Sequence, residues 1–348
     1  EKINQIYLIK GKERTEINQL RIGQIGGLVK LKDTHTSDTL SDQKSPCVLP
    51  RIEFPQASIS VAVVPRSKGD EEKVSGGLAR LHEEDPTFSY AYDAEGHQQL
   101  IYGLGELHLN VIVARLQRKF GVAVDLLKPR IHYRETITRR AEAQGKHKKQ
   151  TGGRGQYGDC WLRLEPKPRG EGFEFAEEIF GGAIPKNYIP SIEKGVVETM
   201  ATGVLAGYPV VDLKCTVYDG SYHEVDSSDI AFKLAGQLAF KNACEKAGMI
   251  LLEPIMNVEI TVPAQYLGAI TGDLSARRGI IQGMETIGDL QVIRATVPEA
   301  EMYLYSNTLR SATQGRGVFT MKFSHYAEVP REIAAKIIEE SKKSRQSS

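Results

Sequence analysis

The sequence predicts an α+β protein built from several small domains. Two observations lead to this fold class. The same order of strands and helices occurs twice along the chain, and a segment with a different order lies between the two copies. With 348 residues, of which 41% are hydrophobic and 26% are charged, the chain is long enough for two to four compact domains. We therefore expect a multidomain α+β protein.

The first segment, residues 1–53, is expected to be part of a β-barrel. Its short apolar runs, such as QIYLI, GQIGGLVKL and DTL, are separated by Gly, Asp and Asn. Such residues favour turns between antiparallel strands. A closed barrel usually needs more strands than this segment supplies. The prediction is therefore a partial barrel.

Residues 57–130 carry the first copy of the repeated order. The stretch SISVAVV alternates as a strand does, and residues 70–85 place apolar side chains at helical spacing behind an acidic first turn. The strands FSYAY and QLIYGL follow, then a helix over residues 106–120 that ends at Gly121, then the strand VAVDLL. This βαββαβ order is typical of a ferredoxin-like fold.

Residues 255–329 repeat that order. MNVEITV is expected to be a strand and GAITGDLSARRG a helix, followed by a strand pair in IIQGMETI and LQVIRATV. A helix in EMYLYSNTLRSATQG and a last strand in GVFTMKFSHYAEV complete the copy. The chain is thus expected to contain two ferredoxin-like domains.

Residues 131–254 form a different unit. It contains a hairpin, a helix in SIEKGVVETMAT and a longer helix in SSDIAFKLAGQLAFKNACEKAG. Ser227 or Ser228 suits the N-cap of the longer helix, and Gly248 suits its end. A final amphipathic helix is expected over residues 331–343.

The longer helix of this unit carries an apolar stripe. Ile230, Leu234 and Leu238 recur at i, i+4 and i+8. Residues at this spacing lie on one side of a helix. One apolar face along the helix is therefore predicted.

Composition excludes several classes of protein. The 45 Lys and Arg residues nearly balance the 44 Asp and Glu residues, so a nucleic-acid surface requires local clustering. The four cysteines form no CxxC pair, which argues against a zinc site or a disulfide framework, and we expect them in the core of a cytoplasmic protein. No apolar run approaches the roughly 20 residues that span a bilayer, so no membrane partner is expected. Because the chain opens on Glu1 in strand-like sequence, we expect a fragment of a longer polypeptide.

No motif for catalysis or metal binding is found. GGRG lacks the GxxxxGK[ST] spacing of a phosphate-binding loop, and GLGELH lacks the third glycine of the dinucleotide fingerprint. The histidines form no HxH or HxxxH pair, and no GxSxG elbow occurs. We predict no catalytic residue, no metal site and no cofactor on this chain.

A basic, glycine-rich loop is the first candidate binding surface. Residues 139–154 carry six Lys or Arg residues, among them Lys146, Lys148 and Lys149. The loop runs on into QYG, whose amide and aromatic ring, together with the preceding guanidinium, suit RNA base edges, base faces and phosphates. A charge run on a surface is more often only a solvated face, and the added glycines and aromatic ring weaken that interpretation.

The second candidate is the loop YDGSYHEVDSSD, residues 218–229. It lies between a predicted strand and a capped helix, which would present His223 at a loop tip. We expect this loop and the basic loop to lie side by side at one end of the middle domain, with their polar groups exposed and without intramolecular partners.

Several motifs together resemble elongation factor G, a ribosomal translocase. They are EEDPTF, GLGELHL, YRETIT, QTGGRGQYG, YDGSYHEVDSS, GDLSARRG and LRSATQGRG, and the resemblance covers essentially the whole chain. It implies that residues 1–53 match part of domain II, 57–130 domain III, 131–254 with 330–343 the ribosomal-protein-like domain IV, and 255–329 domain V. The GTPase domain is absent from these residues, so the resemblance places GTP and magnesium on that missing domain.

The resemblance also implies roles for individual residues. In elongation factor G, GTP hydrolysis is coupled to tRNA and mRNA movement, and the tip of domain IV reaches the decoding centre. The tip residues implied here are Gln150, Gly152, Gly153, Arg154, Gly155, Gln156, Tyr157 and His223. The possible ribosomal RNA contacts implied are Lys146, Lys148, Lys149, Arg277 and Arg278. The partners implied are the RNA of both ribosomal subunits and the tRNA–mRNA pair, and a monomer is expected.

Two alternatives remain open. GKHKK is more basic than in many members of the family, and GDCW stands where others often have histidine and valine. These departures leave room for a paralogue that acts in ribosome recycling or ribosome protection. A protein that binds RNA by itself, without GTPase activity, also fits the chain.

Overall fold

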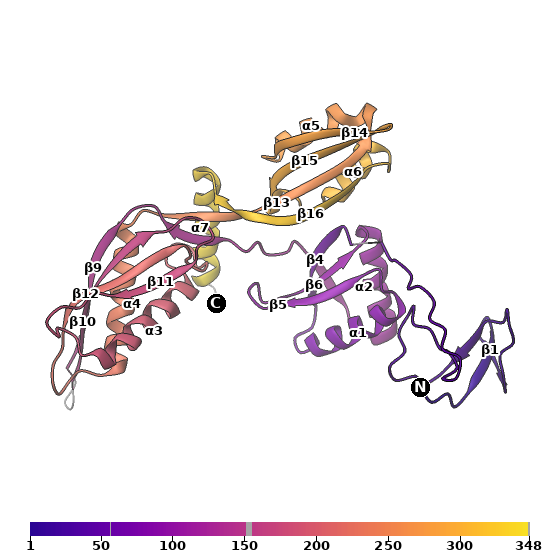
Figure 1. Cartoon of the computed structure of the whole chain (residues 1–348), viewed down its shortest axis with the longest axis horizontal. Coiled ribbons are helices and arrows are strands. Elements are labelled where there is room, and N and C mark those ends of the chain that lie inside the picture. Colours follow the sequence, from indigo (N-terminus) through magenta and orange to yellow (C-terminus); the bar gives the residue numbers. More distant parts are fainter. Residues whose placement is uncertain (56, 151–154, 347–348) are drawn as a thin grey trace. The chain divides into compact units, whose positions relative to one another are not determined.

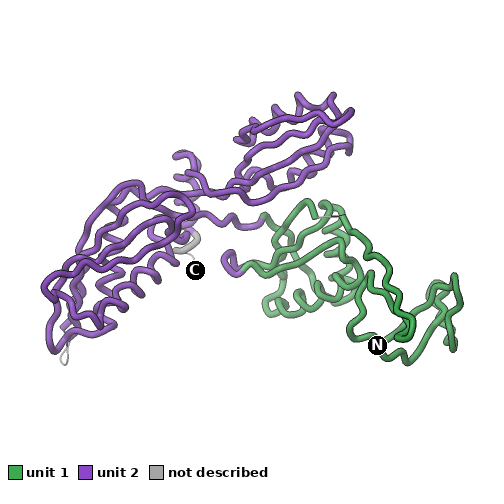
Figure 2. The backbone as a smooth tube through the Cα atoms, in the orientation of Figure 1, with its two compact units in different colours: residues 1–93, 98–128 green, residues 94–97, 129–348 purple. Residues whose placement is uncertain are grey.

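The computed structural model describes residues 1–55, 57–150 and 155–346, and the chain divides into two compact units (Figure 2). The units consist of the following segments: Glu1–Asp93 with Gln98–Lys128, and Ala94–His97 with Pro129–Ser348. Among the described residues the strands form four separate sheets, with helices between them in sequence (Figure 1). The predicted class, a multidomain α+β protein, is confirmed.

The N-terminal segment of the first unit is a small open sheet. Its strands β1 (Ile6–Lys10), β2 (Glu13–Ile17) and β3 (Gly26–Leu28) are antiparallel in the order β2-β1-β3. The stretch DTL, predicted as a strand, does not form a strand. No residue from 1 to 50 is buried. Three short strands are too few to close around a core. Here the described residues form a sheet rather than the packed wall of a barrel.

The rest of the first unit has the predicted βαββαβ order. Its elements are β4 (Ile59–Pro65), α1 (Glu71–Glu84), β5 (Ser89–Asp93), β6 (Gln98–Gly103), α2 (Glu106–Phe120) and β7 (Val124–Leu127). The sheet is antiparallel in the order β5-β6-β4-β7, as in a ferredoxin-like domain. Helix α2 has the predicted bounds, and Gly121 ends it in the left-handed conformation with φ of 69°.

The second copy of this order lies in the second unit. Its elements are β13 (Met249–Pro263), α5 (Leu267–Ala276), β14 (Ile280–Ile287), β15 (Leu290–Pro298), α6 (Tyr305–Thr313) and β16 (Val318–Glu328). The sheet order is β14-β15-β13-β16, and the helices pack on it through a core that includes Ile260, Leu274 and Tyr305. The predicted repeat is confirmed.

Strand β13 is longer than the predicted strand over residues 256–262. Its first residues pair with β8 (Arg134–Ile137), and its later residues pair with β15 and β16. The expected junction between residues 254 and 255 therefore falls inside one continuous strand. A strand that is paired in this way leaves no flexible linker at that point.

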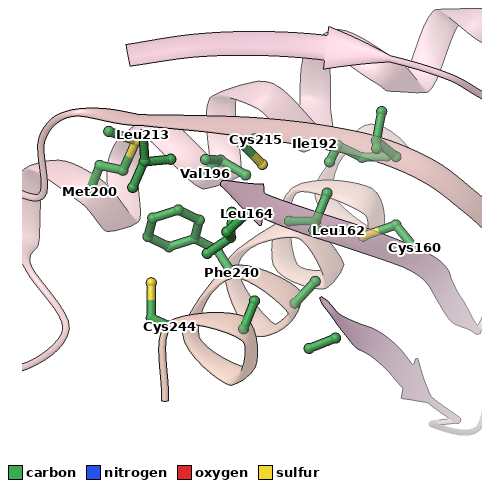
Figure 3. Packing of buried hydrophobic residues seen from close by; sticks show 14 of the residues in the cluster. Cys160, Leu162, Leu164, Ile192, Val196, Met200, Leu213, Cys215, Phe240 and Cys244 are labelled. Atoms are coloured by element: carbon green, nitrogen blue, oxygen red, sulfur yellow. The ribbon is translucent and has the colours of Figure 1, made fainter. Parts of the chain in front are cut away.

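The middle domain is a four-stranded sheet with two helices on one face (Figure 1). Its strands are β9 (Ala141–Lys149), β10 (Gln156–Pro166), β11 (Phe173–Glu177) and β12 (Leu213–Ser221), in the order β11-β12-β10-β9. The helices are α3 (Ile189–Thr202) and α4 (Asp229–Lys246). Figure 3 shows Leu162 and Leu164 of β10 packed with Val196 of α3 and Phe240 of α4.

The face of helix α4 that packs into the core is not the predicted apolar stripe. Ile230 and Leu238 are 63% and 40% exposed, and Leu234 is half-buried. The buried face consists of Ala231, Phe232, Ala235, Gly236, Ala239, Phe240, Ala243 and Cys244. A Cβ atom on Gly145 of β9 would lie 2.1 Å from the carbonyl oxygen of Ala235, so the strand lies directly against the helix backbone. Small residues, rather than the largest apolar ones, make this contact possible.

Glu135 of β8 holds a loop of the middle domain. Its side chain is fully buried, and its carboxylate accepts hydrogen bonds of 2.7–3.0 Å from five consecutive backbone N–H groups, those of residues 204–208. Leu205 and Ala206 of that loop pack against α7 (Arg331–Gln346). The last helix therefore docks on a loop that a single carboxylate holds in place.

Three of the four cysteines are buried, as predicted. Burial raises the pKa of Cys160 and Cys215, and it raises the pKa of Cys244 to about 12. Cys47 is exposed, so its prediction as a core residue is wrong. It lies in the N-terminal segment, which buries no residue from 1 to 50.

Candidate nucleic-acid interface

The two predicted loops of the middle domain lie side by side. The backbone N–H of Gly155 donates to a carboxylate oxygen of Asp226 at 3.0 Å, and the N–H of Tyr157 donates to the carbonyl oxygen of Asp226 at 2.9 Å. The Ser227 hydroxyl donates to the carbonyl oxygen of Tyr157 at 3.0 Å. The loops are thus joined by hydrogen bonds that each use at least one backbone atom, and we call the loops over residues 150–157 and 218–229 the tip loops. Of the predicted tip residues, Gly152, Gly153 and Arg154 lie outside the described part of the chain.

His223 is exposed on the second tip loop, as predicted. Its side chain is 56% exposed, and its Nδ1 accepts the backbone N–H groups of Val225 and Asp226, both at 3.3 Å. A neutral ring that accepts at Nδ1 carries its proton on Nε2 and can donate there. The ring of Tyr157 lies 6.4 Å from the imidazole, centroid to centroid. The expectation that His223 has no intramolecular partner is wrong at Nδ1, because the ring caps its own loop.

The first tip loop also uses part of its polar surface internally. Gln150 is exposed, but the Oε1 atom of Gln156 lies 2.9 Å from Nε2 of His147 on the neighbouring strand. The expected absence of an intramolecular partner is therefore wrong for Gln156 as well. A side-chain pair across an antiparallel ladder stiffens the hairpin that carries the loop.

The lysines of the hairpin are more accessible. Lys148 and Lys149 are exposed, and the side chain of Lys146 is 50% exposed. The Lys146 ammonium lies 5.5 Å from the centre of the Tyr157 ring and 4.0 Å from a carboxylate oxygen of Asp159. The hairpin thus presents ammonium groups beside an aromatic ring.

Arg277 is engaged within its own domain. Its guanidinium donates to the Asp273 carboxylate and to the Thr308 hydroxyl, and it lies 5.0 Å from the centre of the Tyr305 ring. Its side chain is only 20% exposed. These contacts give Arg277 a structural role within its domain, and its contact with ribosomal RNA stays a prediction.

Arg278 is paired with two carboxylates. It donates two hydrogen bonds to the carboxylate of Glu253, whose side chain is 3% exposed, and a third to Glu301. These bonds raise the pKa of the guanidinium. No signal in the local sequence separates Arg278 from an exposed arginine, because Glu253 lies on β13 and meets it only in the fold.

A third loop at the same end was missed by the sequence analysis. Residues 178–188 follow β11, and the Tyr188 ring stacks on Phe232 of α4 at 4.7 Å. The Tyr188 hydroxyl donates to the carbonyl oxygen of Ser227, at 3.4 Å. Phe180 of this loop is 94% exposed, and the adjacent glycine pair in IFGGAIP has positive φ at both residues. That glycine pair was the available signal.

The chemistry of this end of the domain is that of a binding surface. Its exposed groups are an imidazole, amides, ammonium groups and aromatic rings, which contact bases and phosphates in RNA. Among the described residues, no group of three His, Cys, Asp or Glu side chains could hold a metal ion. In the same part of the chain, no helix is both long enough and apolar enough to cross a membrane.

Comparison with known families matches three consecutive parts of the chain. Residues 54–128 match the family model for elongation factor G domain III, residues 129–248 match domain IV, and residues 250–337 match the elongation factor G C-terminus. These ranges cover the two ferredoxin-like domains, the middle domain and part of α7.

Individual relatives agree with the family models. Elongation factor G of Aquifex pyrophilus is 53% identical over 342 residues, which are 98% of this chain and 49% of that protein. A crystal structure of a Thermus thermophilus protein has 42% sequence identity and a TM-score of 0.82, and the match covers 97% of this chain and 51% of that one. The chain therefore spans about half the length of the relatives it matches.

Proposed function

Because this chain belongs to the elongation factor G family, we propose that it is the ribosome-binding portion of a translocase that moves tRNA and mRNA. In this proposal the tip loops enter the decoding centre and contact the codon–anticodon pair. GTP and magnesium would be bound by a GTPase domain that is not among these residues. The protein would act as a monomer in the cytoplasm, with ribosomal RNA of both subunits as further partners.

The observation that carries the proposal is the joined pair of tip loops with an exposed donor. Asp226 ties Gly155 and Tyr157 to its own loop, and His223 caps its loop through Nδ1. The Nε2 proton then belongs to a ring that is held in a defined position. A positioned donor on a stiff hairpin can hinder backward slippage by steric and hydrogen-bonding contact, which requires no covalent chemistry. The exposed lysines of the hairpin suit phosphates of ribosomal RNA.

The test is His223→Ala in the protein that joins this chain to its GTPase domain. The rate of mRNA movement on the ribosome is measured beside ribosome-stimulated GTP hydrolysis. We expect movement to slow by roughly tenfold or more, because a lost charge-assisted or positioned hydrogen bond costs about 1.5–3 kcal/mol. Hydrolysis is expected to stay near the unmodified rate.

A matched control is His325→Ala, which removes an exposed histidine from β16 of another domain. His325→Ala is expected to change the free energy of unfolding by less than about 0.5 kcal/mol, as is usual at the surface. His223→Ala also removes the acceptor of two backbone N–H groups and is expected to cost about 0.5–1.5 kcal/mol, so circular dichroism is used to check that the variant is folded. If His223→Ala moves mRNA at the unmodified rate, the tip assignment is wrong.

A further inference from the structure

The middle domain has a sheet face that its helices leave open (Figure 1). Along β10, Cys160, Leu162 and Leu164 point into the core against α3 and α4. Because successive side chains in a strand point to opposite faces, Asp159, Trp161 and Arg163 lie on the other face. The open face therefore carries a carboxylate, an indole and a guanidinium in one row.

The end of this face nearest the tip loops is held by Asp159. Its side chain is almost completely buried, and it accepts hydrogen bonds from the Ser221 hydroxyl at 2.7 Å and from the Gln144 amide at 2.8 Å. Since Ser221 donates its proton to Asp159, the Tyr157 hydroxyl donates to Ser221, at 2.7 Å. This chain of bonds fixes the Tyr157 ring, beside which the Lys146 ammonium lies.

The middle of the face holds an aromatic pair. The rings of Trp161 and Tyr218 are tilted by 50° with centroids 6.4 Å apart. The Arg163 guanidinium lies 4.8 Å from the centre of the Tyr218 ring, and the Tyr218 hydroxyl donates to Glu142 at 3.3 Å. Arg163 also donates to Glu142 at 2.9 Å. The rings are thus fixed before any partner arrives, which lowers the entropy cost of binding.

The charges on the face favour an anionic partner at the tip end. Glu142 pairs with Arg163 and Arg140, but Arg163 also pairs with Glu178 and Arg140 lies 4.0 Å from Glu165, so the middle of the face carries no excess positive charge. Asp159 accepts hydrogen bonds as described above, and the Lys146 ammonium lies 4.0 Å from it. Lys146 and Lys148 remain accessible on β9, and both face the same side as the aromatic row because they pair with Asp159 and Tyr157. The face is continuous with the tip loops, since the ring centroids of Tyr157 and His223 lie 6.4 Å apart.

We propose that this open face, defined by Lys146, Lys148, Tyr157, Trp161 and Tyr218, binds single-stranded RNA. Bases stack on the Trp161 and Tyr218 rings, while the lysines contact phosphates. A sheet that presents fixed aromatic rings between cations is a known way to bind unpaired bases. The inference takes RNA as the partner from the proposed function, and it adds a surface beyond the tip loops.

The test uses Trp161, the single tryptophan of the chain, as a fluorescent reporter. The purified chain is titrated with an unstructured oligoribonucleotide of about 12 nucleotides, comparable to the sites of other single-strand binders. We expect saturable quenching that weakens as salt is raised, because bound phosphates release counterions.

Variants then locate the contact. Tyr218→Leu keeps apolar bulk but removes the ring, and it is expected to weaken binding roughly tenfold or more. Lys146→Gln removes one exposed ammonium group. It is expected to reduce the slope of log affinity against log salt concentration by about one, because one phosphate contact is lost. Tyr92→Leu removes a ring that is 65% exposed in the other unit, and binding should not change. Circular dichroism of each variant checks that the fold is kept.

The outcomes separate this inference from the proposed function. Weaker binding in Tyr218→Leu and Lys146→Gln, with His223→Ala unchanged, supports the open face. If Tyr218→Leu and Lys146→Gln bind the oligoribonucleotide as tightly as the unmodified chain does, the inference is wrong. It is also wrong if His223→Ala is the one variant that loses binding, because the RNA would then lie at the tip loops. If the oligoribonucleotide does not quench Trp161 fluorescence, the inference is wrong. Quenching by a ribosomal protein would then indicate a protein partner for this face. None of these results alters the translocation test.

Discussion

The tip loops and the turn at Arg277 and Arg278 are both basic motifs for which the sequence predicts RNA contacts, but they differ in what their polar groups touch. In the turn, carboxylates from Asp273, Glu253 and Glu301 take up the guanidinium groups. In the tip loops each hydrogen bond between the loops uses at least one backbone atom, and the His223 side chain stays 56% exposed. The difference shows that a basic motif in the sequence does not by itself reveal whether its side chains stay exposed, because carboxylates from distant elements can pair with them.

The largest expected effect in this comparison comes from Arg278→Ala. The substitution leaves the Glu253 carboxylate, which is 3% exposed, buried without its cation. Breaking a buried pair from one side costs about 3–5 kcal/mol. We expect a lower urea midpoint and faster hydrogen exchange in β13 and α5.

The matched control for this variant is Arg294→Ala. Arg294 also pairs with two glutamates, but its side chain is 51% exposed. Surface pairs of this kind contribute about 0–1 kcal/mol. Equal destabilisation by the two variants would contradict a structural role for Arg278.

A smaller effect is expected for Gly145→Ala, which tests how the tip hairpin is positioned. The new Cβ atom would lie 2.1 Å from the carbonyl oxygen of Ala235, so β9 and α4 must separate. Overpacking of this kind costs about 1–3 kcal/mol. The urea midpoint is expected to fall, and translocation is expected to slow because the hairpin carries the first tip loop.

Gly283→Ala is the control for the glycine substitution. Gly283 lies in β14, and no atom lies within 4 Å of the position its Cβ would take. The free energy of unfolding should change little. A midpoint for Gly145→Ala that equals this control would show that the hairpin is not held by its contact with α4.

The smallest effect concerns pH and the open sheet face. Hydrogen bonds from Arg140 and Arg163 lower the pKa of Glu142 from 4.5 to about 2. A carboxyl group with a lowered folded-state pKa stabilises the fold fully above its unfolded-state pKa, and this stabilisation is lost as pH falls through the folded-state value. The stability difference between the wild type and Glu142→Gln should therefore be constant above about pH 5 and shrink from there towards pH 2. A difference that stays constant over this range would mean that Glu142 is not paired in solution.

Local signals in the sequence were sufficient for most helices and strands. The bounds of α2 and its end at Gly121 follow from apolar spacing and a left-handed glycine, and β14 matches the stretch IIQGMETI. Ser228 caps α4 by accepting the N–H of Ala231. These features depend on residues within a few positions of one another, so the sequence predicts them directly.

The candidate site was only partly predictable. The placement of His223 on an exposed loop follows from its turn residues and the capped helix after it. The glycine pair within residues 178–188 indicates a turn, but nothing in that sequence shows that the loop ends beside Ser227, so the loop was missed as part of the site. Asp226, which joins the tip loops, was missed for the same reason.

By itself, the sequence determined the order of elements, the repeated ferredoxin-like fold and the motifs that identify the family, since all of these are patterns along the chain. Only the tertiary structure decided which face of α4 is buried, which arginines meet carboxylates and where β13 begins. Those outcomes depend on residues that are distant in sequence. The alanine face of α4 is buried because Gly145 lets β9 approach its backbone, and Arg278 is occupied because β13 brings Glu253 beside it. Periodicity reports a residue's neighbours along the chain, whereas charge pairing and close packing depend on neighbours that only folding supplies.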